Sequence, residues 1–193
     1  MNSLCVYCGS SSGSEPAYAA AARELGQLLA VQQIELIYGG GRVGLMGTLA
    51  DAVLDAGGRV QGVIPQSLAD REVAHHGLTQ LHVVETMHQR KALMAELSDG
   101  FLALPGGLGT FEELFEIWTW AQLGMHTKPI GLLNVAGYFD LLLQFLDHAV
   151  SQQLLKPVHR AVLNVSTDPA EMLRMLRQAL PVWVPKWIDS SQT

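Results

Sequence analysis

Short apolar segments alternate with longer stretches of helical periodicity along this sequence, and this alternation limits the possible folds more than any other feature. The apolar segments, which predict strands, span residues 3–8, 34–38, 59–64, 81–84, 100–104, 129–133 and 161–165. The helical stretches span residues 16–31, 45–56, 87–97, 110–123, 138–151 and 169–180. Because the strands are apolar throughout and helices separate them, they predict a mostly parallel sheet covered by helices on both faces. We therefore expect a single doubly wound, Rossmann-like α/β domain.

The domain is expected to occupy residues 1–180, since no internal repeat or linker divides that range. Residues 181–193 are expected to form an arm that packs on this or a neighbouring subunit. Charged residues make up 16% of the chain, below the roughly 25% of ordinary soluble domains, and hydrophobic residues make up 49%. This composition excludes a disordered chain and predicts a large buried core.

The charge balance argues against two classes of partner. The 12 Lys and Arg residues stand against 18 Asp and Glu residues, and the resulting net charge of -6 attracts neither nucleic acid nor an anionic membrane. No apolar run approaches the ~18 residues that a membrane-spanning helix needs, and the first residues do not resemble a signal peptide. We therefore expect a cytoplasmic protein without nucleic-acid or membrane partners.

Cys5 and Cys8 form a C-x-x-C pattern, which occurs in redox and metal sites. Both lie in the first predicted strand, where residues three apart point to opposite faces of the sheet. The sequence has no second cysteine pair, and its histidines lack the spacing of metal ligands. We therefore expect two free, buried thiols and no metal site.

Ligands of parallel α/β sheets bind beyond the carboxyl ends of the strands, so four segments that follow predicted strands are candidates for a site. The first comprises residues 8–14, which are all small and include Gly9 and Ser10. Such a segment lets a phosphate or sugar approach backbone N–H groups. The alternative is a flexible connector in which Ser14 caps the following helix.

The second segment comprises residues 38–47, in which Gly39, Gly41 and Gly44 match G-x-G-x-x-G. The match follows the second strand rather than the first, and no acidic residue stands at the end of the next strand. It therefore favours a phosphate-binding turn over a dinucleotide site, with a purely structural tight turn as the alternative. The sequence contains no G-x-x-x-x-G-K-[ST], which argues against nucleoside triphosphate hydrolysis of the P-loop type.

The third segment, residues 105–113, reads Pro-Gly-Gly-Leu-Gly-Thr-Phe-Glu-Glu and joins a strand to a helix. The N–H groups of such a turn and the positive end of the helix together bind phosphate. Thr110 and Glu113 also match a T-x-x-E capping box, in which each side chain satisfies an unpaired backbone donor. In that structural interpretation Glu112 complements the helix dipole.

The fourth segment, residues 87–91, reads Met-His-Gln-Arg-Lys and begins a helix. Two adjacent cations, Arg90 and Lys91, oppose the dipole at this end of a helix unless an anionic ligand or the carboxylates of the third segment balance them. A solvated surface pair is the alternative. Together the four segments supply glycine turns, two cations and two carboxylates, which suit a nucleoside monophosphate or a phosphosugar.

Residues 105–113 resemble the P-G-G-x-G-T-x-x-E motif of the LOG (Lonely Guy) family. Four further segments are similar to the same family: residues 38–47, 87–91, 119–124 and 128–134. Members of this family are cytokinin riboside 5'-monophosphate phosphoribohydrolases, some of which have been labelled lysine decarboxylases. No pyridoxal-binding pattern is visible in this sequence, so we set the decarboxylase label aside.

The resemblance implies hydrolysis of the N-glycosidic bond of an N6-substituted adenosine 5'-monophosphate, releasing the free base and ribose 5-phosphate. It implies a homodimer and assigns catalysis to Arg90 and Glu113. It assigns substrate contacts to a larger set of residues: Gly9, Ser10, Gly40, Gly41, Gly44, Met46, Glu72, Lys91, Gly106, Gly107, Leu108, Gly109, Thr110, Phe111, Glu112 and Thr119. We expect no metal or other cofactor.

The residue types suit this chemistry, because breaking the C1'–N bond develops positive charge on the sugar. A carboxylate at Glu113 can stabilise that cation and position water or a ribose hydroxyl. Arg90 can hold either the phosphate or Glu113 in a bidentate pair.

Two other functions remain open. One is a general nucleosidase for unmodified purine or pyrimidine monophosphates, which needs the same phosphate and ribose contacts. The other is a non-catalytic carrier of a nucleotide or cofactor with the same fold. The presence of both Arg90 and Glu113 favours an enzyme over a carrier.

Overall fold

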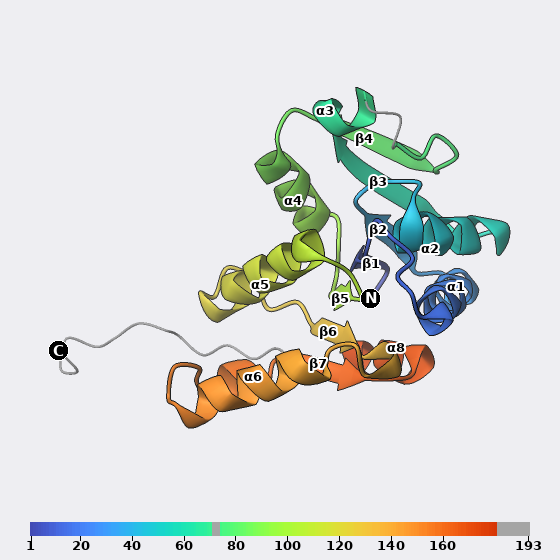
Figure 1. Cartoon of the computed structure of the whole chain (residues 1–193). Helices are drawn as coiled ribbons and strands as arrows, with labels where there is room; N and C mark the ends of the chain where they lie inside the picture. Colours follow the sequence, from blue (N-terminus) through green and yellow to red (C-terminus); the bar gives the residue numbers. More distant parts are fainter. Residues whose placement is uncertain (71–73, 181–193) are drawn as a thin grey trace.

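Every predicted strand is present in the computed structural model, which describes residues 1–70 and 74–180 (Figure 1). The strands are β1 (Ser3–Tyr7), β2 (Glu35–Tyr38), β3 (Val60–Pro65), β4 (Gln80–Val84), β5 (Phe101–Ala103), β6 (Ile130–Leu133) and β7 (Leu163–Ser166). Within the described residues they form one sheet in the order β4-β3-β2-β1-β5-β6-β7, with every pairing parallel. The predicted parallel sheet is confirmed.

The long helices also lie where the periodicity predicts them, with ends that differ by at most two residues. They are α1 (Pro16–Val31), α2 (Gly44–Asp55), α4 (Met87–Glu96), α5 (Leu108–Gln122), α6 (Asp140–Ser151) and α8 (Pro169–Gln178). The shorter elements α3 (Gln66–Leu68), η2 (Val135–Gly137) and α7 (Pro157–Arg160) were not predicted, because three or four residues are too few to show a helical period.

The order in which the chain adds strands to the sheet reverses between β1 and β5. From the central β1 the chain runs outward through β2, β3 and β4, and then returns to pair β5 with the other edge of β1. At such a switch point the loops after the two strands separate around a crevice. Here they lie side by side, since the N–H of Gly9 donates to the carbonyl oxygen of Pro105 over 3.0 Å.

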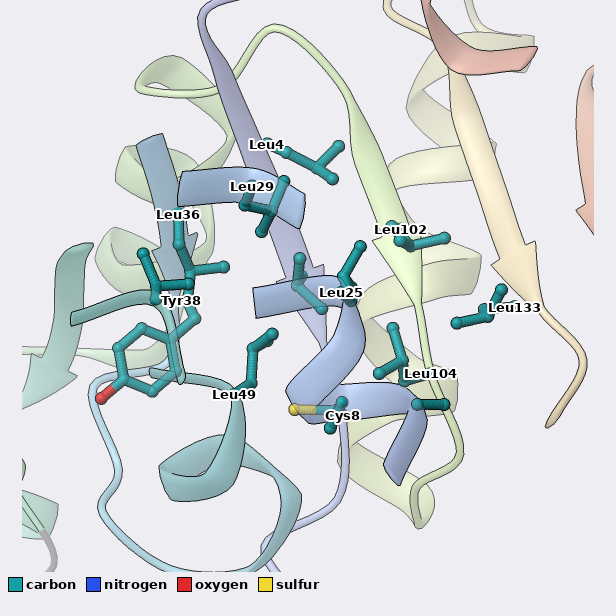
Figure 2. Packing of buried hydrophobic residues seen from close by; sticks show 14 of the residues in the cluster. Leu4, Cys8, Leu25, Leu29, Leu36, Tyr38, Leu49, Leu102, Leu104 and Leu133 are labelled. Carbon is teal, nitrogen blue, oxygen red and sulfur yellow. The ribbon is translucent and has the colours of Figure 1, made fainter. Parts of the chain in front are cut away.

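Helices α1, α2 and α8 cover one face of the sheet, and α4, α5 and α6 cover the other (Figure 1). On the first face, Leu25 and Leu29 of α1 lie against Leu4 and Leu36 of the two central strands (Figure 2). All four side chains are fully buried. Burial of each contributes about 1.5–3 kcal/mol, so these contacts hold the helices, and the loops that begin them, against the sheet.

The two cysteines occupy opposite faces, as the strand geometry predicts. Cys8 belongs to the core beneath α1 and α2, and Cys5 to the core beneath α4 and α5. Both thiols are free and buried, and burial raises the pKa of each well above its ordinary value. The prediction of two free thiols is confirmed.

One alternative interpretation of the first segment is wrong. Helix α1 begins at Pro16 with Glu15 as its N-cap residue, so Ser14 does not cap it. Proline sets its own φ at the first helical position, and this position of Pro16 fixes the start of the helix. The predicted arm at residues 181–193 and the predicted contact residue Glu72 lie outside the described residues. No helix in the described ranges is long and apolar enough to cross a membrane.

Candidate active site

An arginine and a glutamate from two neighbouring helices meet at the carboxyl edge of the sheet. Arg90 lies in α4 and Glu113 in α5, and these helices lie side by side (Figure 1). Nη2 of Arg90 is 3.5 Å from Oε1 of Glu113, and the two side chains are only 11% and 10% exposed. Each charge offsets part of the cost of burying the other.

A capping box fixes the first turn of α4. The hydroxyl of Thr86 accepts a hydrogen bond from the N–H of Gln89 over 3.2 Å, and the side-chain oxygen of Gln89 accepts one from the N–H of Thr86 over 3.3 Å. This arrangement satisfies two of the helix's unpaired donors. Arg90 follows directly, so its direction is set by a well-held turn.

Lys91 forms ion pairs with carboxylates of α5 and does not line the cavity described below. Its Nζ donates to Glu112 and, over 2.9 Å, to Oε1 of Glu116, and its side chain is 10% exposed. Glu112 of the third segment, together with Glu116 beyond it, therefore balances the charge of Lys91 at the start of α4, and a balance by carboxylates of that segment was one of the outcomes expected from the sequence. The ion pairs hold α4 and α5 in register.

The carboxyl group of Glu113 has a strongly raised pKa. Burial raises its pKa from 4.5 to about 7; the charge of Arg90 opposes this rise and the charge of Glu112 adds to it. A carboxyl group with a pKa near neutral pH can change its protonation state during a reaction, which is a property of functional groups in enzymes.

The predicted capping box between Thr110 and Glu113 is not formed. Helix α5 begins at Leu108 with Gly107 as its N-cap residue, so Thr110 is already the third residue of the helix. The carbonyl oxygen of Gly107 accepts the N–H of Phe111 over 3.1 Å and starts the helical ladder. With the helix start shifted toward the strand, Glu113 faces the sheet in the second turn and is available to pair with Arg90.

A cavity of 490 Å³ opens beside the Arg90–Glu113 pair. Its wall combines ends of β1, β2 and β3 with the first turns of α2, α4 and α5: Cys8, Gly9, Ser10, Gly39, Gly41, Val43, Met46, Ile64, Leu68, Met87, Arg90, Gly107, Leu108, Gly109, Thr110, Glu112 and Glu113. The volume falls in the range of small-molecule sites, roughly 300–1,000 Å³.

Two glycines allow the loops to close around this cavity. A Cβ at Gly39 would lie 1.9 Å from Nη2 of Arg90, so the guanidinium group occupies the space that a side chain would need. Gly44 has φ +63°, and a Cβ there would lie 2.3 Å from the carbonyl carbon of Ser10. The second segment thus packs backbone against backbone with the first, which only glycine permits.

A second cavity of 290 Å³ adjoins the first and shares Gly9, Ser10 and Gly107 with it. Its other lining residues come from the first loop, from α1 and α2, and from the segments after β5 and β6: Ser11, Ser12, Gly13, Tyr18, Leu45, Pro105, Gly106 and Tyr138. Gly106 therefore faces this smaller cavity rather than the larger one.

Most predicted site residues lie on the two cavity walls, but five do not. Gly40, Gly44, Lys91, Phe111 and Thr119 are outside both linings. Thr119 is exposed on α5 and donates its hydroxyl to the carbonyl oxygen of Phe115 over 2.7 Å, and the ring of Phe111 meets that of Phe139 edge to face. Glu72 cannot be placed, because it lies in residues 71–73 between the described ranges.

Six residues that line the larger cavity were not among the predicted substrate contacts: Cys8, Gly39, Val43, Ile64, Leu68 and Met87. Four of them lie in the candidate segments 8–14, 38–47 and 87–91, but Ile64 and Leu68 do not. A signal existed for Ile64 and Leu68, because they lie at the carboxyl end of β3 and just after it, on the same edge as the four segments. Among the residues that the structure describes, no group of three or more His, Cys, Asp or Glu side chains could hold a metal ion.

The fold and this cavity define a Rossmann-like protein with a glycine-lined cavity at the switch point of its sheet. A family model described as "Possible lysine decarboxylase" matches residues 46–176. A cytokinin riboside 5'-monophosphate phosphoribohydrolase of Rhodococcoides fascians is 53% identical over 167 residues, covering 86% of this chain and 84% of that protein. The phosphoribohydrolase LOG7 of Arabidopsis thaliana is 49% identical over 178 residues, covering 92% and 82%. The chain belongs to the LOG family.

Solved structures share the fold at lower identity. The molybdenum cofactor carrier protein of Chlamydomonas reinhardtii has a TM-score of 0.68 and 20% identity, covering 91% of this chain and 96% of that chain. The molybdenum cofactor binding protein of Rippkaea orientalis has a TM-score of 0.68 and 23% identity, covering 91% and 94%. These likenesses show a common fold and nothing about the ligand.

Gly39→Ala and Gly109→Ala form a matched pair of variants that tests two parts of the cavity wall: the side next to Arg90 and the first turn of α5. Among the described residues, no atom other than those of its chain neighbours and its own helix backbone lies within 4 Å of a Cβ at Gly109. The added methyl group therefore enters the cavity, and binding of AMP should weaken by about tenfold with an unchanged melting temperature. In Gly39→Ala the methyl group displaces the flexible end of Arg90, which should leave the fold intact but impair the Arg90–Glu113 pair. Calorimetric titration with AMP and thermal unfolding check both variants. Unaltered AMP binding by Gly109→Ala would show that AMP does not bind against the first turn of α5.

The pKa of Glu113 predicts a pH-dependent stability. Because the folded state raises this pKa from 4.5 to about 7, it binds the proton more tightly than the unfolded chain does. The associated stability is fully present below about pH 4.5 and is lost as the pH rises through about 7. From pH 4.5 to 8, the free energy of unfolding should fall by about 3 kcal/mol relative to that of Glu113→Gln. Urea unfolding of both proteins measures this change. A difference in free energy of unfolding that did not vary with pH would show that folding does not raise the pKa of Glu113.

Proposed function

We propose that this protein hydrolyses the N-glycosidic bond of N6-substituted adenosine 5'-monophosphates, giving a free cytokinin base and ribose 5-phosphate. The observation that carries the proposal is the buried Arg90–Glu113 pair on the wall of a cavity that also contains the start of α5. The name of the relative from Rhodococcoides fascians, at 53% identity, supports the same reaction.

Helix α5 supplies groups for both ends of the ribose phosphate. Gly107, Leu108 and Gly109 form the start of the helix. The N–H groups there have no partners within the helix, and together with the positive end of the helix dipole they favour binding of a phosphate. Glu113 lies on the same helix four residues after Gly109, which corresponds to a rise of about 6 Å. In ribose 5-phosphate the phosphate and C1' lie at opposite ends of the sugar, so a phosphate at the first turn brings C1' toward the carboxylate.

Glu113 acts as its carboxylate. As the C1'–N bond lengthens, positive charge grows on C1' and the ring oxygen, and the negative charge of Glu113 stabilises it. Water adds its oxygen to C1', the bonding electron pair leaves with the base, and a proton from the water ends on the base. Positioned beside C1', the same carboxylate orients the water or a ribose hydroxyl.

Arg90 keeps Glu113 in this role. Its charge lowers the pKa of Glu113 against the effect of burial, which increases the carboxylate fraction at neutral pH. Its guanidinium group lies over Gly39 and has further N–H donors for an oxygen of the substrate.

A carrier function is less well supported. Proteins with molybdenum cofactor in their names share the fold at 20–23% identity, whereas the relatives near 50% identity are named as enzymes. A carrier also has no need for a carboxyl group with a pKa near 7 in its cavity.

The homodimer and the cytoplasmic compartment remain proposals. Large apolar side chains are exposed just after α5 and on α6, among them Leu123, Leu141 and Phe145. Trp118 is buried and donates its indole N–H to the carbonyl oxygen of His159 over 3.0 Å, while Trp120 on the same helix is only half-buried. A second copy of the chain over these helices would cover this surface.

A chromatographic assay of the purified protein tests the function. Isopentenyladenosine 5'-monophosphate, AMP, isopentenyladenosine and lysine are offered separately, and release of isopentenyladenine from the monophosphate alone is expected, because the first turn of α5 requires a phosphate. Equal or faster release of adenine from AMP would identify a general nucleosidase. Tight nucleotide binding without release of any base would identify a carrier.

Arg90→Ala and Glu113→Ala are each expected to lower kcat by about a thousandfold or more, because they remove the charges that act in the transition state. Circular dichroism should show that the fold is kept. Arg42→Ala and Glu96→Ala are matched controls, since both residues are exposed and neither lines the larger cavity, and each should keep at least about a tenth of the activity. Near-normal turnover by either test variant would remove that residue from the mechanism.

A further inference from the structure

Tyr138 contacts the glycine turn from the side of the smaller cavity. It lies between η2 and α6, after the carboxyl end of β6. Its hydroxyl donates a hydrogen bond to the carbonyl oxygen of Gly106 over 2.5 Å. Its ring packs edge to face on Tyr18 and Phe139, with ring centroids 5.5 Å and 4.8 Å apart. The phenol is thus held between α1 and the turn before α6.

The backbone that carries Tyr138 is closely held. Ala136 has φ 50°, a left-handed conformation that a residue with a side chain keeps only where the surroundings enforce it, and Gly137 follows with φ 72°. Asn134 provides this support: its side-chain oxygen accepts the N–H of Phe139 over 2.8 Å, and its amide nitrogen donates to Asp140 over 2.7 Å. The position of the Tyr138 hydroxyl is therefore fixed by the fold rather than by the ligand.

The bond to Gly106 also orients the next N–H group. A trans peptide unit is planar, so the C=O of Gly106 and the N–H of Gly107 point in opposite directions. Gly106 lines only the smaller cavity, on the side of Tyr138, whereas Gly107 lines both cavities. With its carbonyl bound by Tyr138, this peptide unit directs its N–H away from Tyr138, toward the larger cavity and the start of α5.

The same peptide unit would invert easily without such a bond. Inversion changes ψ of Gly106 and φ of Gly107, and glycine accepts both conformations at little cost. An inverted unit would present a carbonyl oxygen, instead of an N–H donor, to an anion at the start of α5. The Tyr138 hydroxyl therefore selects the orientation that binds anions.

We propose that Tyr138 is a positioning residue that holds the Gly106–Gly107 peptide unit with its N–H toward the phosphate monoester of the substrate. This role rests on the proposed function only in that the ligand carries a 5'-phosphate. Tyr138 acts through the backbone of Gly107 and has no part in breaking the glycosidic bond.

The test compares Tyr138→Phe, which removes the hydroxyl and keeps the ring, with the wild type and with Tyr18→Phe. The control removes a phenol from the same aromatic cluster but leaves the bond to Gly106. In Tyr138→Phe the ¹⁵N amide resonance of Gly107 should shift in the ligand-free protein, and inorganic phosphate should bind about tenfold more weakly. KM for the nucleoside monophosphate should rise by a similar factor with kcat nearly unchanged. Tyr18→Phe should match the wild type in all three measurements.

A ligand-free Gly107 resonance at the same position in Tyr138→Phe and the wild type would overturn the proposal, even if phosphate bound more weakly, because the hydroxyl would then contact the anion directly. A fall in kcat without a rise in KM would also overturn it. If the wild type released no base but the Gly107 resonance and phosphate affinity changed as expected, the proposed function would fail and the role of Tyr138 would stand.

Discussion

The buried pair of Arg90 and Glu113 is the interaction on which the carboxyl edge of the sheet depends. A charge inside a protein is costly without a partner, so each of these residues requires the other. The pair also places demands on its surroundings. Gly39 must lack a side chain, because the guanidinium group lies where a Cβ would be. Helix α5 begins at Leu108, so Glu113 lies in its second turn, where it is buried.

The same pair links the packing of α4 and α5 to chemistry. Lys91 joins two further carboxylates of α5 to α4, and Glu113 is the carboxylate on the cavity wall that pairs with Arg90. Burial and the neighbouring charges bring the pKa of Glu113 to about 7. The first turn of the same helix, steadied from outside by Tyr138, presents its backbone to the cavity. One helix start therefore combines the proposed anion site with a carboxylate about 6 Å further along the helix.

Sequence patterns predicted the fold well because they are local. Apolar strands and helical periods can be recognised within each element, and all seven strands and six long helices of the described residues lie where these patterns placed them. The site was predicted less completely. The T-x-x-E pattern at Thr110 is compatible both with a capping box and with a helix that has already begun, and only the contact of Gly107 with Phe111 distinguishes them. Thr119 matches a family segment, yet it lies on the exposed side of α5.

The sequence by itself determined that this chain forms a parallel sheet and that its glycine turns, Arg90 and Glu113 gather at one edge. Both conclusions follow from the period of the apolar residues and from the rule that parallel strands end together. Only the tertiary structure decided which cation meets which carboxylate, how far the pKa of Glu113 rises, and that Tyr138 binds the carbonyl of Gly106. These properties depend on distances of a few ångströms between residues that lie 20 or more positions apart in the chain. Such distances are set when α4, α5 and the turn after β6 pack against the sheet. A local sequence pattern cannot predict them.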